Sequence, residues 1–307
     1  MPRLVRFRDR IAGLLDRPVV LHGVLIAGLV FIGWMFTQAT PDRPLTGYDA
    51  HAYYDAASLD DPYRETILGG FDQVGGRYEY KYPPPFAQLL WPLHFLPWPV
   101  FLVLWLVVCY GAFVWLARNW ALVLLFFPPI LLELYYGNVN ILMGVAIVLG
   151  FRWPAAWAFI LLTKITPGVG LVWFAVRREW RSLAIAIGVT AGIAVVSYLL
   201  APGLWSDFLL ASRTQTPATI DVPRQALQVN LPVRLAIAAV VVAWAAWTDR
   251  RWPVPVAVAI SVPFVWWNVL AVLVACIPLA RRETRSTTAS PPLVRAPHAP
   301  DPTPSRP

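Results

Sequence analysis

Charged residues are scarce in this chain of 307 residues: 14% are Asp, Glu, Lys or Arg, against about 25% in soluble domains. The mean hydropathy is +0.57, and apolar runs alternate with short polar segments along most of the chain. This composition excludes an ordinary soluble domain. We predict an all-α, polytopic integral membrane protein.

Lysine is rarer still, because only Lys81 and Lys164 stand beside 23 arginines. The arginines form short clusters between apolar runs and do not line one helix face, which argues against nucleic acid as a partner. Cysteine is also rare: Cys109 and Cys276 lie in separate apolar runs and are expected to be small buried hydrophobes.

Several motifs of soluble enzymes are missing from the sequence. It contains no Walker loop, Rossmann fingerprint, nucleophile elbow or His/Cys metal spacing. His51 and His94 are isolated, and two separated histidines favour structural roles over a metal site. We therefore expect neither a cofactor nor a bound metal.

Apolar runs predict about ten membrane segments within a transmembrane domain of residues 18–280. Two apolar stretches are interrupted by polar or Pro-Gly residues, at Lys164–Gly168 and at Ser261–Pro263, and each is predicted to be a hairpin of short helices. The predicted segments are 18–36, 99–117, 121–136, 139–151, two within 153–176, 182–200, 232–247 and two within 253–279. Residues 84–97 are apolar but broken by prolines, which is typical of an interfacial helix.

The hairpin prediction agrees with the charge pattern. With both hairpins in place, every arginine cluster falls on one side, which the positive-inside rule identifies as cytoplasmic. The basic N-terminus 1–17 and a tail at 281–307, expected to be disordered, share that side. The loops 37–83 and 201–231 then face the outside, as do the turn near residue 138 and Lys164.

The first outer loop, 37–83, carries about half of all acidic residues in the chain. Asp49 follows the first predicted span by about a dozen residues and is flanked by tyrosines, which suit a membrane interface. A carboxylate there can remove a proton from a sugar hydroxyl. A helix cap or a solvated loop acid is the alternative interpretation.

Both lysines lie where a cation has a special reason to be. Lys81 stands between Tyr80 and Tyr82 and could pair with a lipid phosphate, or it could be an ordinary snorkelling lysine. Lys164 lies about eleven residues into an apolar stretch, where an ionisable group is costly and usually has a partner or a ligand. A phosphate or pyrophosphate head group is a natural ligand, and Glu133 is either a partner for a lysine or an interfacial acid.

Ordered sequence blocks resemble glycosyltransferase family 87, the polyprenol-phosphate-mannose-dependent mannosyltransferases of the GT-C architecture. The blocks are Asp49 to Ala57, Tyr82 to Pro84, Gly137 to Asn140 with Asn138 where the family has Gln, Lys164 to Pro167, and Ser261 to Trp267 in looser form. The resemblance covers about residues 45–280.

The resemblance implies a mechanism at the outer face of the plasma membrane. A polyprenyl-phosphate sugar would donate a hexose, expected to be mannose, to a hydroxyl of a lipid or glycan acceptor, with inversion and with Asp49 as the base. We expect Lys81 and Lys164 to bind the donor phosphate. The residues expected to bind substrate are Tyr53, Tyr82, Glu133, Asn138, Asn140 and Thr166.

Two alternatives remain open at this point. Broken helices and an intramembrane lysine also occur in transporters, so a flippase of lipid-linked sugars is the second hypothesis. A transporter would place polar groups near mid-membrane in two corresponding repeats, whereas here they gather on one side and no internal repeat is visible. An inactive relative that acts as a scaffold is the third.

Overall fold

The computed structural model describes residues 18–39, 46–68, 78–214 and 229–281, and every regular element within these ranges is a helix. The all-α prediction is therefore confirmed for the described residues. The predicted N-terminal segment 1–17 and nearly all of the predicted tail 281–307 lie outside them, and the division into three regions stays a prediction.

The helices, with η marking 3-10 helices, are short as often as long. In chain order they are α2 (Pro18–Gln38), α3 (Tyr48–Ala56), α4 (Arg64–Leu68), α5 (Pro84–Leu90), η2 (Trp91–Leu93), α6 (Trp98–Ala117), η3 (Arg118–Trp120), α7 (Ala121–Leu124), α8 (Pro128–Tyr136), α9 (Asn140–Gly150), η4 (Pro154–Ala156), α10 (Trp157–Leu161), η5 (Thr166–Leu171), α11 (Val172–Val176), α12 (Trp180–Leu200), α13 (Pro202–Thr214), α14 (Leu231–Trp247), α15 (Pro253–Ser261) and η8 (Trp267–Ala275).

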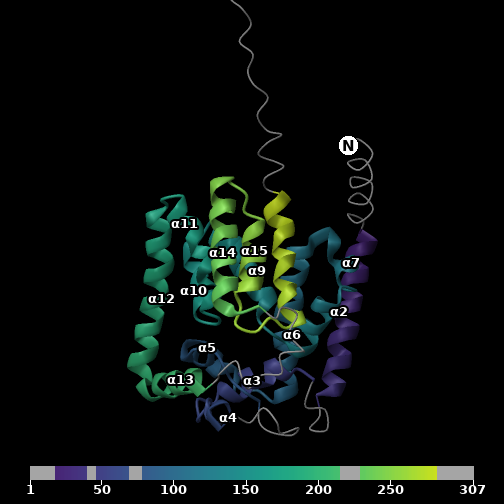
Figure 1. Cartoon of the computed structure of the whole chain (residues 1–307). Helices are drawn as coiled ribbons and strands as arrows, with labels where there is room; N and C mark the ends of the chain where they lie inside the picture. The colour runs from purple at the N-terminus through teal and green to yellow at the C-terminus, as the bar shows by residue number, and fades with distance from the viewer. Residues whose placement is uncertain (1–17, 40–45, 69–77, 215–228, 282–307) are drawn as a thin grey trace, which may run out of the picture.

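Upright helices form a bundle, and a layer of short helices covers one end of it (Figure 1). The covering layer consists of α3 and α4 from the predicted outer loop 37–83, α13 from the predicted outer loop 201–231, and α5 from residues 84–97, where an interfacial helix was predicted. Helices within the two outer loops were not predicted. α12 stands at one side of the bundle, and most of its residues are exposed.

Proline sets where many of these helices begin. It occupies the first turn of α5, α6, α8, α14 and α15. Proline is tolerated there because its missing N–H would have no helical partner and its φ is already helical. The same residue therefore divides apolar sequence into short pieces, as at Pro128, where the predicted span 121–136 becomes α7 and α8.

The prediction of about ten membrane segments is not confirmed. Among the residues that the structure describes, two helices are long and apolar enough to cross a membrane, Trp98–Leu124 and Trp180–Leu200, and a third crossing results if α8 and α9, bent by 105°, count as one span. The shorter apolar helices are His22–Gln38, Thr166–Val176, Leu231–Trp247 and Trp267–Arg281. The other predicted segments are interrupted by Pro, Gly or polar turns and end before spanning length.

The two predicted hairpin breaks are present. α10 ends at Leu161 and η5 begins at Thr166, while α15 ends at Ser261 and η8 begins at Trp267. A third break, at residues 137–139, separates α8 from α9. These three breaks leave polar side chains and free backbone groups in otherwise apolar surroundings, and the candidate site is built from them.

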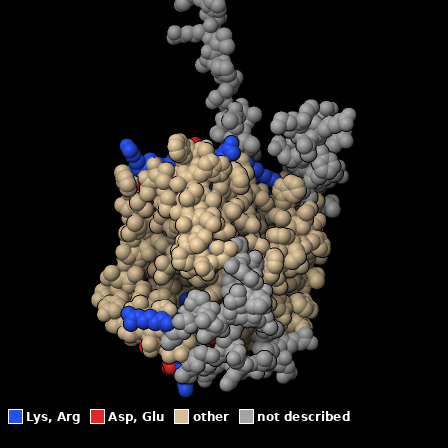
Figure 2. Space-filling view, viewed as in Figure 1, with Lys and Arg blue, Asp and Glu red and all other residues tan. Residues whose placement is uncertain are grey.

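Charged side chains lie at both ends of the bundle. Figure 2 shows Lys and Arg at the upper end of this face, Lys or Arg together with a few Asp or Glu at its lower end, and uncharged residues across most of its middle. The turns from α11 to α12 and from α14 to α15 lie at the upper end in Figure 1. They are joined there by Arg177, whose Nη1 donates to Asp249 Oδ1 at 2.8 Å.

We expect Gly137→Ala to lower the thermal unfolding midpoint of the purified protein. Gly137 has φ +68°, and an added Cβ would lie 2.8 Å from the Cβ of Ala50. The left-handed conformation and the clash together are expected to cost about 1–3 kcal/mol. Gly192→Ala in α12 is the matched control, since nothing lies within 4 Å of its Cβ position. Equal midpoints for both variants would contradict the prediction.

Candidate functional site

Asp49 lies in the first turn of α3, which is docked against the end of α8. The N–H of Gly47, with φ +66°, donates to the carbonyl of Tyr135 at 2.9 Å and fixes the start of α3. Asp49 is half-buried, and its Oδ2 accepts a hydrogen bond from Asn138 Nδ2 at 2.7 Å. A residue from the predicted outer loop thus meets the break between α8 and α9.

Asn138 has partners of opposite charge on its two amide atoms. Its Nδ2 donates to Asp49, and its Oδ1 accepts from Lys164 Nζ at 3.3 Å and from the backbone N–H of Val139 at 2.7 Å. The side chain is only 8% exposed. One amide therefore separates and orients the carboxylate and the ammonium.

Lys164 lies in the break between α10 and η5 and points toward the break between α8 and α9. Its ammonium donates to Asn140 Oδ1 at 2.8 Å as well as to Asn138. It also lies 6.0 Å from the ring centroid of Tyr82, at the edge of cation–π range. Both of these hydrogen bonds end on neutral amides, so among the described residues the positive charge is oriented by dipoles and not by an ion pair.

Glu133 is fully buried in α8 and supports this arrangement from behind. Its Oε1 accepts from the backbone N–H groups of Asn140 and Ile141 at 2.5 and 3.2 Å. Its Oε2 accepts from Asn140 Nδ2 at 2.8 Å and from Asn268 Nδ2 at 3.1 Å. A carboxylate at the N-terminus of α9 satisfies free backbone donors and suits the helix dipole.

The two predicted substrate-binding tyrosines, Tyr53 and Tyr82, form a pair beside the site. Their hydroxyl oxygens are 2.9 Å apart, and the carbonyl of Tyr82 accepts from Tyr63 at 2.7 Å. Tyr53 is fully buried and Tyr82 is 7% exposed. The pair fastens α3 to the segment that leads into α5, and it brings the Tyr82 ring close to Lys164.

Lys81 and Thr166 were also predicted as site residues. Lys81 pairs with Glu79 at 2.6 Å, a partner that was not predicted from the sequence. Thr166 is half-buried, and its hydroxyl oxygen has no hydrogen-bond partner among the described residues. It follows Lys164 by two positions at the start of η5.

Electrostatics at Asp49 combine opposing effects. Burial raises the pKa of its carboxyl, while the Asn138 hydrogen bond and the positive charges of Lys164 and Lys81 oppose the rise. Lys81 therefore acts on Asp49 through its field, despite its ion pair with Glu79. A carboxylate with a raised pKa is a better proton acceptor than a solvated one.

Two polar residues near the site, Asn268 and Arg234, were not predicted from the sequence. Asn268 contacts Glu133, and Arg234 is buried in the first turn of α14. Both interrupt apolar stretches, and a polar residue in such a stretch is the one signal that could have marked them. His51 pairs with Asp55 at 3.2 Å and stacks on Tyr78, which supports the structural role expected for it.

Known proteins resemble this chain in sequence. A family model described as glycosyltransferase family 87 matches residues 80–291, which is more than half of the chain and includes Lys164 and Asn138 but not Asp49. A mannosyltransferase of Mycobacterium tuberculosis is 28% identical over 180 residues. Its name is polyprenol-phosphate-mannose-dependent alpha-(1-2)-phosphatidylinositol pentamannoside mannosyltransferase. The match covers 50% of this chain and 41% of that relative. No solved structure matches the chain.

We expect Glu133→Gln to destabilise the protein strongly. A glutamine amide keeps one acceptor oxygen, but it places an NH₂ group opposite N–H donors whose hydrogen bonds the carboxylate of Glu133 accepts in the native protein. Leaving buried donors unsatisfied costs about 1–3 kcal/mol each. Thermal unfolding in detergent measures the loss, with Glu179→Gln as control because that partly exposed acid bonds mainly Arg177. A Glu133→Gln midpoint no lower than that of the control would contradict the assigned role.

Proposed function

The chain belongs to glycosyltransferase family 87, and we propose that it transfers a hexose from a polyprenyl-phosphate donor to an acceptor hydroxyl. The matched mycobacterial relative is named for a polyprenol-phosphate-mannose donor, which supports mannose as the sugar and a glycolipid as the acceptor class. A lipid-linked donor suits a protein whose sequence lacks a nucleotide-binding motif.

The observation that carries this proposal is the shared contact of Asp49 and Lys164 with Asn138. The carboxylate and the ammonium bond opposite ends of one amide, at 2.7 and 3.3 Å. Sugar transfer from a phosphate needs a base for the attacking hydroxyl and positive charge for the departing phosphate. The two charged groups of this pair can supply both functions.

In the proposed reaction, the Asp49 carboxylate takes the proton of the acceptor hydroxyl. The hydroxyl oxygen bonds to the anomeric carbon while the bond from that carbon to the phosphate oxygen breaks. The electron pair leaves with the polyprenyl phosphate, whose charge Lys164 stabilises. Attack opposite the leaving group inverts the configuration at the anomeric carbon.

The surrounding residues have distinct proposed roles. Thr166 has a hydroxyl without a partner among the described residues, two positions from Lys164, and we assign it a hydrogen bond to the donor phosphate. Lys81 acts at longer range as a second positive charge. Glu133, Asn140 and Tyr82 hold Lys164 in place, so we propose that they position the site more than they contact substrate.

We further propose that the site faces the extracytoplasmic side of the plasma membrane. The α11–α12 and α14–α15 turns, at the basic upper end of Figure 2, would face the cytoplasm under the positive-inside rule. The layer containing α3 lies at the opposite end. In this arrangement the short helices on either side of the three breaks enter the bilayer, but no single one of them crosses it. This arrangement is compatible with the ten membrane segments predicted from the sequence.

The first test is sugar transfer by Asp49→Asn in membranes supplied with labelled polyprenyl-phosphate mannose. Removing a general base is expected to lower the rate by about 10²–10⁴-fold. Asp55→Asn is the matched control, since Asp55 lies on the same helix, is 41% exposed and bonds His51. We expect that control to retain activity at equal expression.

Other outcomes would redirect the assignment. Transfer that survives Asp49→Asn would keep the enzyme class and remove Asp49 as the base. Movement of the lipid-linked sugar across the membrane, without transfer by the wild type to any acceptor tried, would instead favour the flippase hypothesis.

The pH dependence of transfer tests the Asn138 contact. The base must be ionised, so kcat/KM should rise with pH through the pKa of Asp49. Asn138 stabilises the ionised form, and its loss in Asn138→Ala should raise that pKa further. We expect the acidic limb of the profile to move to higher pH. A limb at the wild-type position, in a variant that still transfers, would show that this bond does not govern the base.

A further inference from the structure

Arg234 is a buried cation outside the array just described. It is 4% exposed and lies in the first turn of α14. Its guanidinium donates to four main-chain carbonyls: those of Val229 at 2.7 Å, Ile260 at 2.9 Å, Val262 at 2.6 Å and Pro263 at 2.7 Å. One of these acceptors, Ile260, lies in the last turn of α15, and two, Val262 and Pro263, lie in the break between α15 and η8.

The sequence at this break explains why an arginine is needed. α15 ends at Ser261, and Pro263 prevents the helix from continuing. The last carbonyls of a helix then lack intrahelical donors. In apolar surroundings each unsatisfied carbonyl is costly, and a cation also suits the negative end of the helix dipole. Arg234 meets both demands with the five donors of one planar group.

The segment that Arg234 holds leads directly to the site. η8 begins at Trp267, and the next residue, Asn268, donates to Glu133 Oε2 at 3.1 Å. Glu133 accepts from Asn140 Nδ2, and Asn140 Oδ1 accepts from Lys164 at 2.8 Å. The guanidinium is therefore connected to the ammonium by its hydrogen bonds to residues 260–263, by the main chain from Pro263 to Asn268, and by the hydrogen bonds from Asn268 to Lys164.

We propose that Arg234 is a positioning residue for the donor-phosphate site, acting through Asn268 and Glu133 to fix the Lys164 ammonium. This inference rests on the proposed function, because Lys164 is assigned there to the phosphate of a polyprenyl-phosphate donor. The acceptor side of the site, at Asp49 on α3, lies at the other end of the Asn138 amide and should depend less on Arg234.

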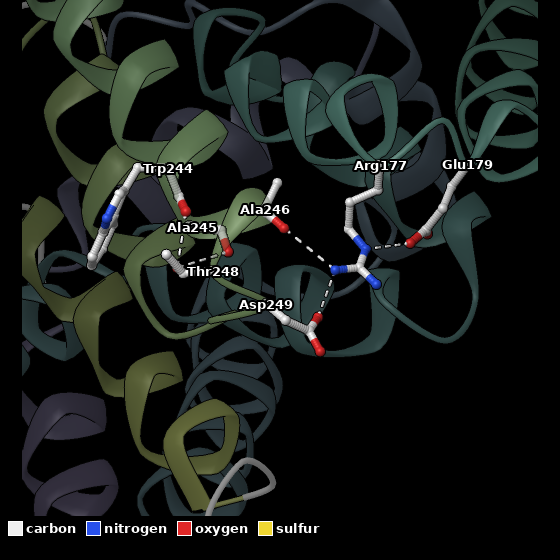
Figure 3. A network of polar contacts seen from close by, with 7 residues as sticks. All are labelled: Arg177, Glu179, Trp244, Ala245, Ala246, Thr248 and Asp249. Carbon is white, nitrogen blue, oxygen red and sulfur yellow. Dashed lines mark hydrogen bonds and ion pairs between the residues drawn. The ribbon is translucent and has the colours of Figure 1, made fainter.

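Arg177 provides a matched control within the same chain. It also joins two turns, and it donates to the carbonyl of Ala246 at 3.3 Å and to the carboxylates of Glu179 and Asp249 (Figure 3). It contacts α14 at the end opposite Arg234, and none of its contacts leads to Lys164. Replacing it should affect stability without selectively affecting donor binding.

The experiment compares Arg234→Lys with Arg177→Lys in lipid nanodiscs, measuring kcat and the KM for each substrate. Lysine keeps the charge but has three donors on one atom in place of five across a planar group, so it cannot bond all four carbonyls. Displacement of Lys164 should raise the donor KM of Arg234→Lys roughly tenfold and leave the acceptor KM unchanged. A smaller folded fraction alone would lower the apparent kcat and change neither KM. An unchanged donor KM in folded Arg234→Lys would overturn the proposal.

If Arg234→Lys does not fold, Asn268→Ala provides a second test of the proposal, because it removes the hydrogen bond to Glu133 and leaves Arg234 in place. It should raise the donor KM by a similar factor, and a wild-type KM would overturn the proposal. In the double variant that combines Arg234→Lys and Asn268→Ala, the two increases in donor KM should not multiply if both act through one path.

A wild type that neither binds polyprenyl phosphate nor transfers sugar would refute the proposed function itself. An active wild type with an indifferent Arg234→Lys would refute only this inference.

Discussion

The site depends on one constraint: an acid and a lysine lie near each other in mostly apolar surroundings. Asn138 holds the two charged groups apart, because it bonds Asp49 through its Nδ2 and Lys164 through its Oδ1. Direct pairing of the two charges would leave each less able to act on a substrate. An intervening amide keeps both oriented and partly exposed. Gly137, with its left-handed backbone, and Glu133 of α8, whose carboxylate bonds the first N–H groups of α9, shape the turn that presents this amide.

The broken helices of the fold follow from the same requirement. A continuous membrane helix satisfies its own backbone groups and has none to spare for a site. Here the breaks at residues 137–139, 162–165 and 262–266 release backbone and side-chain groups into the bundle. Glu133, Asn268 and Arg234 form hydrogen bonds with several of these groups. The helix α3 then closes the arrangement from outside the bundle and adds Asp49.

Most residues of the hydrogen-bonded cluster could be named from the sequence, because ionisable residues are rare in it and the asparagines fall in a block that resembles the family. Asp49, Lys164, Glu133, Asn138 and Asn140 were all predicted, and the structure joins them by hydrogen bonds. The partner of Lys81 and the role of Arg234 were not predicted. Glu79 is one of several acids near Lys81 in the sequence, and the acceptors of Arg234 are main-chain carbonyls, which have no sequence signature. The number of crossings was not confirmed either, because hydropathy alone does not separate a short re-entrant helix from a full span.

The central claim is that the donor phosphate binds at Lys164 and the acceptor hydroxyl is activated at Asp49. Its most direct test is an experimental structure of the protein with a polyprenyl-phosphate sugar bound. Our account predicts a phosphate oxygen within hydrogen-bond distance of Lys164 Nζ, with the sugar directed toward Asp49. A phosphate bound instead among the arginines at the opposite end of the bundle, with Lys164 still bonded only to Asn138 and Asn140, would contradict it.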